Sequence, residues 1–326
     1  MSKKAMIGFG GGILAIVAAV VIYMVGFSGG PGGPTGGGDA ASGKARAEKL
    51  FSALNSSGDF KARGGVVTWG SAVNLGDNGV LIKSLSIIGK KKKGEAGEVT
   101  AEELRINRLD WNKVNSSPYA DLEIKGLTSK QFADSPQFKG FMATTGMKNL
   151  VLDMKIRYAY KADGQLMDVQ EIVVTARELG TFTMRAQIHG LDIAKLQEMQ
   201  KSGKLDPAQM MGMAAAIRIG KIHLSFKDSG AIDKSATMQA QKTGSDKDKV
   251  LSGMIAQLEQ QKAAIPVEIG RTAADAVIKF LKNKSTLTAK ADPASPVPVL
   301  QLVMGGRNPA NIDKIAKQLN VSVTAD

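Results

Sequence analysis

The sequence predicts an α+β protein in which one N-terminal transmembrane helix precedes a long, curved antiparallel β-sheet with short helices. Three observations support this fold class. Residues 5–27 contain no charged side chain, residues 28–43 are rich in glycine, and alternation of apolar and polar residues dominates the remainder. A period of two is typical of strands with one buried face. Long strands that follow one another with short helices between them favour an antiparallel arrangement.

The uncharged segment 5–27 is expected to be a retained membrane anchor. At about 1.5 Å per residue a helix of this length reaches roughly 34 Å, which is enough to cross a bilayer. Lys3 and Lys4 precede it and favour a cytoplasmic N-terminus. The alternative is a cleaved signal peptide, but the apolar run is longer than such a peptide needs. The residues expected to form the apolar part of the anchor are Ile13, Leu14, Ile16, Val17, Val20, Val21 and Ile22.

Residues 28–43 are expected to be a flexible tether. Half of them are glycine, and Pro31 and Pro34 interrupt the rest, so there is little to bury. Its reach is roughly 20–24 Å on the flexible-chain estimate. The predicted organisation is therefore an anchor over 1–27, a tether over 28–43 and an extracytoplasmic domain over 44–326, with a subdivision near 140–150. The protein would be a single-pass protein of a bacterial inner membrane, with its main domain in the periplasm.

Composition restricts the chemistry of this domain. The chain has no cysteine, which excludes disulfides, thiolate zinc sites and thiol catalysis. Its net charge is +13, so the inner membrane, anionic lipids and other acidic envelope components are natural partners. Nucleic acid is not expected, because of the compartment and because only 5% of residues are aromatic. No feature of the sequence sets the oligomeric state.

The densest basic segment, which we name the lysine run, consists of Lys90, Lys91, Lys92 and Lys93. Two interpretations are open. The lysine run could bind anionic groups, or it could simply be the solvated tip of a β-hairpin.

The longest alternation predicts a strand with one apolar and one polar side. Its apolar side, which we name the apolar row, is Leu150, Leu152, Met154, Ile156, Tyr158 and Tyr160. Asp163 and Gly164 then predict a tight turn, and residues 166–176 a returning strand.

Further strands are expected at 182–188 and 222–226, and earlier at 66–69, 80–88, 99–109 and 122–125. After a turn at Ser229 and Gly230, Ala236, Met238 and Ala240 continue the alternation. A last strand is expected at 321–325.

Helices are expected where the apolar spacing changes to three and four. Leu251, Met254, Ile255 and Leu258 fit one helical face, and Ala274, Val277, Ile278 and Leu281 fit another. The pairs Asp206-Pro207 and Asn308-Pro309 are typical helix starts, with an N-cap followed by proline. The second pair would begin a helix carrying Ile312, Ile315 and Leu319 on one side.

No catalytic constellation emerges from the sequence. The only histidines are His189 and His223, each on the polar side of an alternating strand. A metal site would need them on adjacent strands with a carboxylate nearby, whereas histidines at exposed positions need no ligand. We therefore predict no catalytic, metal-binding or cofactor-binding residues, and no enzymatic activity.

The C-terminal part is similar to known proteins of bacterial envelopes. The segments that carry the resemblance are 276–288 (AVIKFLKNKSTLT), 296–298 (PVP) and 319–325 (LNVSVTA), together with the turn at Lys227, Asp228, Ser229 and Gly230. Over about residues 145–326 they resemble uncharacterised proteobacterial membrane-anchored envelope proteins, and more loosely the YdgA-like and AsmA-like proteins. The AsmA-like resemblance implies an extended sheet whose apolar face shelters lipid chains.

Two functions from different classes follow from these observations. In the first, the apolar row lines an open groove and the protein handles lipids. In the second, the apolar row belongs to a closed core and the basic surface is an interaction scaffold for an acidic envelope partner. A packed sheet interior would favour the scaffold, and an apolar cleft open to solvent would favour lipid handling. An enzyme is the least expected class.

Overall fold

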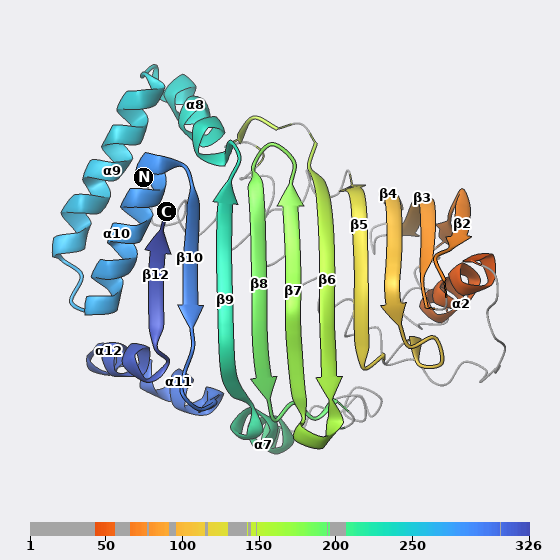
Figure 1. Ribbon diagram of the computed structural model, residues 1–326. Coiled ribbons are helices and arrows are strands. Elements are labelled where there is room, and N and C mark those ends of the chain that lie inside the picture. Colours follow the sequence, from red (N-terminus) through yellow and green to blue (C-terminus); the bar gives the residue numbers. More distant parts are fainter. Residues whose placement is uncertain are drawn as a thin grey trace. The chain divides into compact units, whose positions relative to one another are not determined.

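The computed structural model describes residues 43–55, 66–76, 78–90, 96–114, 117–129, 142, 145–147, 149–193, 195, 207–306 and 308–326. These residues form an α+β fold with twelve strands, antiparallel wherever their register is described, and several short helices (Figure 1). The predicted α+β class with a large open antiparallel sheet is therefore confirmed. The chain divides into two compact units, which we describe separately.

The N-terminal unit lies within Met1–Ala143, Met147–Ala159 and Lys195–Gly203. Its strands follow the order β1-β3-β4-β5-β6, with β2 also paired to β3. Helix α2 (Gly43–Asn55) contacts β1, β2 and β3. The strands are β1 (Val66–Thr68), β2 (Ser71–Asn74), β3 (Val80–Lys90), β4 (Ala96–Leu109), β5 (Tyr119–Ser129) and β6 (Val151–Lys161).

The core of the N-terminal unit lies on one side of these strands. Val80 and Ile82 of β3 are fully buried, and Ile106 of β4 is nearly so. Arg46 of α2 is also buried, and its Nη1 lies 2.6–2.7 Å from Asn74 Oδ1 and from the carbonyl oxygens of Gly76 and Gly79. This guanidinium therefore fixes α2 to the turn between β2 and β3.

The C-terminal unit lies within Thr144–Gly146, Tyr160–Ala194 and Lys204–Asp326. Its strand order is β7-β8-β9-β10-β12, with β11 also paired to β9. The strands are β7 (Leu166–Ala176), β8 (Gly180–His189), β9 (Arg218–Asp228), β10 (Thr286–Ala291), β11 (Val297–Pro298) and β12 (Val321–Ala325). The helices are α7 (Pro207–Ala216), α8 (Ala231–Thr243), α9 (Lys247–Ala263), α10 (Glu268–Asn283), α11 (Val299–Gly305) and α12 (Pro309–Gln318), and the 3-10 turn η3 is Ala162–Gly164.

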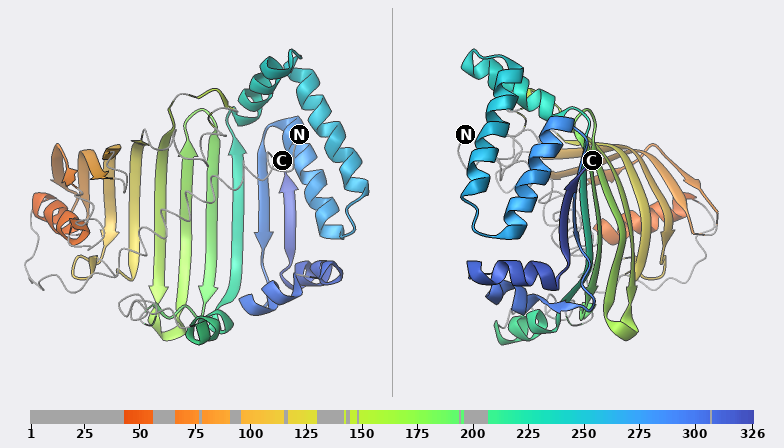
Figure 2. Two further views of the ribbon diagram at one scale, coloured as in Figure 1. Left: turned by 180° about the vertical axis from the view of Figure 1, so that it is seen from behind. Right: turned by 60° about the vertical axis from the view of Figure 1, so that its left-hand side comes forward.

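Helices cover one side of the C-terminal strands (Figure 2). Phe280 and Leu281 of α10 form a buried cluster with Ala325 of β12, and Phe226 of β9 and Leu287 of β10 pack against it. Phe226, Leu287 and Ala325 are cross-strand partners in one row, so their side chains share one side of the sheet. Side chains alternate along a strand, so the residues directly before and after Phe226, Leu287 and Ala325 in the sequence lie on the opposite side of the sheet.

Most predicted elements are present with small changes of boundary. The strand predicted at 166–176 is β7, and the one at 321–325 is β12. The apolar row lies on β6 except for Leu150, which directly precedes that strand. Asp163 and Gly164 lie in the predicted tight connection, which is completed by Gln165 in a left-handed conformation. Asn308 caps α12 by accepting a hydrogen bond from the backbone N–H of Ala310.

The alternation at Ala236, Met238 and Ala240 is wrongly predicted, because these residues belong to helix α8. Ala236 and Ala240 are four residues apart and both are buried on one side of that helix. Apolar residues at every second position also recur at every fourth position, as on one side of a helix. The pattern alone therefore does not distinguish a strand from a helix. Asp228 decides in favour of the helix, because its carboxylate accepts hydrogen bonds from the N–H groups of Gly230 and Ile232 at its start.

The predicted anchor at 5–27 and the tether at 28–43 lie outside the described residues, except for Gly43, which begins α2. Among the helices that the structure describes, none combines the length and the apolar character needed to cross a bilayer. The anchor and its orientation stay predictions.

Candidate functional site

The lysine run falls at a hairpin between two paired strands. Lys90 ends β3 and pairs with Ala96 at the start of β4, so Lys91, Lys92 and Lys93 belong to the connection between these strands. Those three residues lie outside the described part of the chain. Their position in the sequence agrees with the hairpin alternative, and their capacity to bind anions stays a prediction.

The apolar row is largely buried in this structure. Leu150, Leu152, Met154 and Ile156 expose only 1–3% of their surface. Side chains so deeply buried are typical of a closed core, which was the second alternative left open by the sequence. Lipid binding along this row stays a prediction that its burial does not favour.

The two tyrosines of the apolar row are only half-buried, and each hydroxyl has a backbone partner. Tyr158 donates a hydrogen bond to the carbonyl oxygen of Ser117 at 3.2 Å, and Tyr160 donates one to that of Leu191 at 2.9 Å. Burial raises the pKa of Tyr158 above its ordinary value, so the phenol stays protonated at neutral pH. Both hydroxyls therefore have structural roles here.

The two histidines lie on β8 and β9 and are not cross-strand partners, because His189 pairs with Arg218 and His223 with Arg185. Within the described residues, no group of three or more histidine or carboxylate side chains is arranged to hold a metal ion. The cross-strand partners of His223 are the cations Arg185 and Lys290, and they belong to a basic surface.

The side of β8, β9, β10 and β12 that α10 does not cover is named the outer face here. Its central line, the basic row, joins Arg185 on β8, His223 on β9 and Lys290 on β10, which are direct cross-strand partners. Adjacent strands are about 4.8 Å apart, so the Arg185 and Lys290 backbones are about 10 Å apart. Glu171 of β7 forms an ion pair with Arg185 at 3.6 Å.

The basic row changes the electrostatics of its own histidine. Partial burial, and then the charges of Lys290 and Arg185, lower the pKa of His223 below its ordinary value. Each cation disfavours a third positive charge between them. A bound anion would act in the opposite direction, because it would favour the imidazolium.

A line of hydroxyl groups runs beside the basic row. This hydroxyl row consists of cross-strand partners Thr183, Ser225, Thr288 and Thr324. The next partners along β7 and β8, Thr175 and Thr181, have their hydroxyl oxygens 3.0 Å apart. Serine and threonine hydroxyls can donate and accept hydrogen bonds, so the row can pair with hydroxyls or with anionic oxygens.

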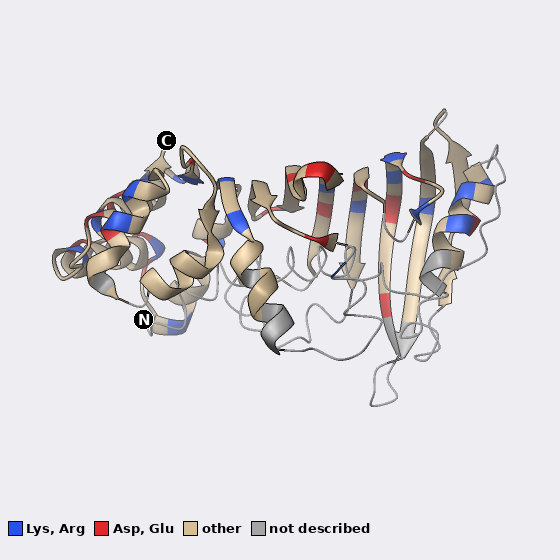
Figure 3. Cartoon of the chain, turned by 90° about the horizontal axis from the view of Figure 1, so that it is seen from below, with Lys and Arg blue, Asp and Glu red and all other residues tan. Residues whose placement is uncertain are grey.

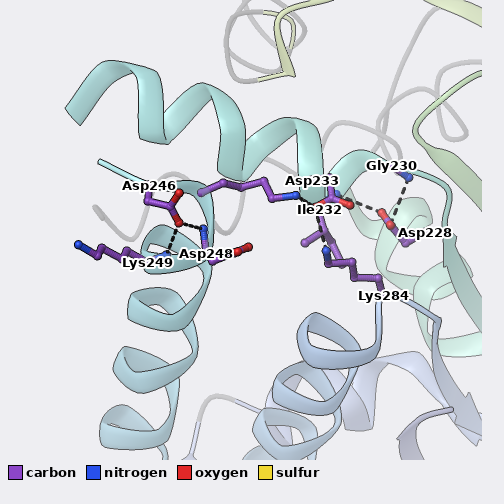
Figure 4. Close-up of polar contacts among 9 residues, drawn as sticks. Asp228, Gly230, Ile232, Asp233, Asp246, Asp248, Lys249 and Lys284 are labelled. Carbon is purple, nitrogen blue, oxygen red and sulfur yellow. Dashed lines mark hydrogen bonds and ion pairs between the residues drawn. The ribbon is translucent and has the colours of Figure 1, made fainter. Parts of the chain in front are cut away.

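The helices behind the outer face are held by a carboxylate that bridges two lysines (Figure 4). Asp233 of α8 lies 2.8 Å from Lys284 Nζ at the end of α10 and 2.9 Å from Lys247 Nζ at the start of α9. Hydrogen bonds from Lys284 and Lys247 lower the pKa of Asp233. Asp313 of α12 similarly caps α10 by accepting from the N–H groups of Glu268 and Ile269.

An exposed apolar patch lies elsewhere in the C-terminal unit, on the contacting helices α7 and α11. Neither helix contains a charged residue (Figure 3). Met211 is 68% exposed and Met304 66%, and Leu300 and Val303 are exposed beside Met304. We name these four residues the apolar patch.

Sequence reasoning did not identify the outer face. Arg185, His223 and Lys290 come from three strands that are far apart in the chain, and β10 was not predicted as a strand. A sequence signal did exist, because Thr286, Thr288 and Lys290 alternate with Leu287 and Ala289. Six residues are too few for such a pattern to be decisive without the register.

A family model described as "Uncharacterized protein" matches residues 173–326, which is less than half of the chain. The match contains every residue of the basic row and the hydroxyl row. A search of curated proteins finds no significant match. The resemblance to YdgA-like and AsmA-like proteins stays a prediction.

Proposed function

We propose that this protein is a non-enzymatic binding module, anchored in the bacterial inner membrane, whose β-rich domain presents a basic surface to an acidic envelope component in the periplasm. The uncharged segment 5–27 and the preceding lysines support the anchor. The net charge of +13 supports an acidic partner.

The outer face is the single observation that carries the binding role. One side of the C-terminal strands packs on helices through Phe226, Leu287 and Ala325. The other side carries hydroxyls and cations at regular strand spacing, without contributing to that core. A rigid sheet that holds polar groups at fixed positions is suited to binding an extended ligand, because little ordering of the protein is needed.

Topology is the direct test of the anchored, periplasmic arrangement. A reporter enzyme that is active only in the periplasm, fused after Asp326, should be active, and a reporter that works only in the cytoplasm should be silent. The matched control inserts two aspartates within residues 5–27, which should prevent membrane insertion. Activity of the cytoplasmic reporter alone would overturn the proposal.

Lipid handling is the second candidate, and the apolar patch on α7 and α11 favours it. Exposed methionine side chains adapt to ligands of variable shape. If lipids bind there, the full chain with Val303→Ser and Met304→Gln should co-purify with less lipid by mass spectrometry. Val66→Thr and Val73→Thr form the matched control, because these valines of the N-terminal unit are also about half exposed. Equal lipid content in all three proteins would remove this candidate.

A further inference from the structure

We infer that the outer face binds a linear anionic polysaccharide, with acidic groups of the polymer on the basic row and sugar hydroxyls on the hydroxyl row. This inference rests on the proposed function, and it names the partner class for that same face.

The charge of the outer face favours an anion. Arg185, His223 and Lys290 form one line, and within the described residues no carboxylate lies at ion-pair distance from Lys290. Arg185 has the partner Glu171, but its side chain is still 55% exposed and retains donors for a second carboxylate. Lys221, on the same side of β9, pairs with Asp292 at 3.1 Å at the margin of the face.

The arrangement of the basic row suits an extended polymer. The backbones of Arg185 and Lys290 lie about 10 Å apart along a line perpendicular to the strands. A chain with repeated acidic groups that crosses the strands can therefore contact both cations. The hydroxyl row runs parallel to the basic row, so the same chain can accept and donate hydrogen bonds along its length.

The composition of the outer face argues against the two competing polyanions. Outward positions on β9, β10 and β12 carry Lys, His, Ser and Thr, with no aromatic ring on which a nucleic-acid base could stack. They also carry no apolar side chain that could enter a bilayer. An anionic membrane could therefore attract this face only through charge.

The test measures binding of oligogalacturonate, which carries a carboxylate on every sugar, to the full chain in uncharged detergent micelles. A neutral maltooligosaccharide of equal length controls for sugar binding without charge. Binding of oligogalacturonate should be detectable at low salt and should weaken as salt is raised, while the neutral sugar should bind at least tenfold more weakly.

A double variant, Arg185→Gln with Lys290→Gln, should reduce the affinity for oligogalacturonate at least tenfold. Its matched control is Lys83→Gln with Lys125→Gln on the polar side of the N-terminal sheet. Both variants remove two positive charges, and in both one of the two is ion-paired, since Lys125 lies 3.7 Å from Glu103. An equal loss in both variants would show that only net charge matters, and would overturn the inference.

The titration of His223 adds a readout that is local to the basic row. Two cations act on the imidazole, Arg185 from β8 and Lys290 from β10, and Lys221, two residues away on β9, forms an ion pair with Asp292. Bound carboxylates should raise the pKa of His223, and NMR can follow it because the chain has only one other histidine.

Three outcomes overturn the inference: no binding of oligogalacturonate, no shift at His223 on binding, or binding confined to phosphatidylglycerol vesicles. The last would make the face a membrane contact. A periplasmic reporter signal with any of these outcomes leaves the anchored module intact and removes only the polysaccharide. A cytoplasmic reporter signal would instead remove the proposed function, whatever the binding result.

Discussion

Basic and acidic side chains alternate across the strands on the polar side of the N-terminal sheet. Lys83, Glu103 and Lys125 are cross-strand partners on β3, β4 and β5, and Arg105, Glu123 and Lys155 follow the same order on β4, β5 and β6. The C-terminal outer face has Arg185, His223 and Lys290 in the corresponding arrangement, with no acidic residue between the cations.

The N-terminal sheet places an acid between neighbouring cations, and the C-terminal face does not. Opposite charges on facing positions stabilise a sheet by about 0.2–1 kcal/mol for each pair, and like charges destabilise it. Ion pairs form across the N-terminal sheet, and one example is the 2.9 Å ion pair between Arg157 and Asp121. On the C-terminal face Lys290 and Arg185 help to lower the pKa of His223, and an anionic ligand would act on that pKa in the opposite direction.

The largest expected effect comes from placing a charge on the apolar row. We expect Met154→Asp to destabilise the N-terminal unit by several kcal/mol, because Met154 is 3% exposed and the carboxylate would be buried without a partner. Both tryptophans of the chain, Trp69 and Trp111, belong to this unit, so tryptophan fluorescence during urea unfolding would report the loss.

Met154→Leu is the control, and it should cost less than about 1.5 kcal/mol because it conserves volume. A small effect of Met154→Asp would mean that the apolar row is hydrated. That outcome would restore the open groove and the lipid-handling alternative.

The second expected effect concerns how each unit holds its helices. The N-terminal unit uses the buried Arg46, and Arg46→Met should cost about 2–4 kcal/mol, because it leaves the carbonyl oxygens of Gly76 and Gly79 without this donor. Arg46→Lys should lose less, since it keeps the charge but not the planar guanidinium. The same tryptophan fluorescence measures both, and equal losses would contradict a role for the guanidinium geometry.

A third, smaller effect is expected for the C-terminal counterpart, Asp233. Its side chain is 41% exposed, so screening by solvent limits the loss in Asp233→Asn to about 0.5–1 kcal/mol. Lys284 and Lys247 lower the pKa of Asp233 in the folded state. Its contribution is therefore complete above the unfolded pKa, about 3.9, and is lost as the pH falls through the folded pKa.

Urea unfolding followed by circular dichroism at pH 7 and at pH 3 would measure this loss. The difference between wild type and Asp233→Asn should shrink at pH 3 and in 1 M salt. Asp163→Asn, in the exposed turn η3, is the matched control and should show no such dependence. A difference that is unchanged by acid and salt would exclude the ion pairs as its cause.

The sequence predicted the strands well where one side is continuously buried. The apolar row is long enough for the period of two to dominate, and a shift of one residue would expose every apolar side chain in it. The caps of the later helices were also readable, because Asn308 is followed directly by proline at the first turn.

The outer face could not be predicted, because it depends on the pairing of strands rather than on any one segment. His223 is 38 residues after Arg185 and 67 before Lys290, and only the register brings the three together. Helix α8 shows a related limit. The residues around Ala236 and Ala240 suit a helix and an alternating strand alike, and the hydrogen bonds from Gly230 and Ile232 to Asp228 become visible only in the structure.

The smallest expected effect comes from Lys290→Glu, which would give the C-terminal face the alternation of the N-terminal one. A carboxylate at 290 would face His223, which would then lie between Arg185 and an acid. Stability should change by at most about 0.5 kcal/mol, because the position is exposed and the pair is screened. The pKa of His223 should rise, since one repelling cation is replaced by an attracting anion. NMR titration measures that rise, and Lys83→Glu is the matched control that should leave the pKa of His223 unchanged.

The affinity of Lys290→Glu for oligogalacturonate should fall below that of Lys290→Gln, because the acid repels the ligand as well as removing a contact. If Lys290→Glu binds as well as the wild type, the absence of an acid between the cations is not what makes this face different.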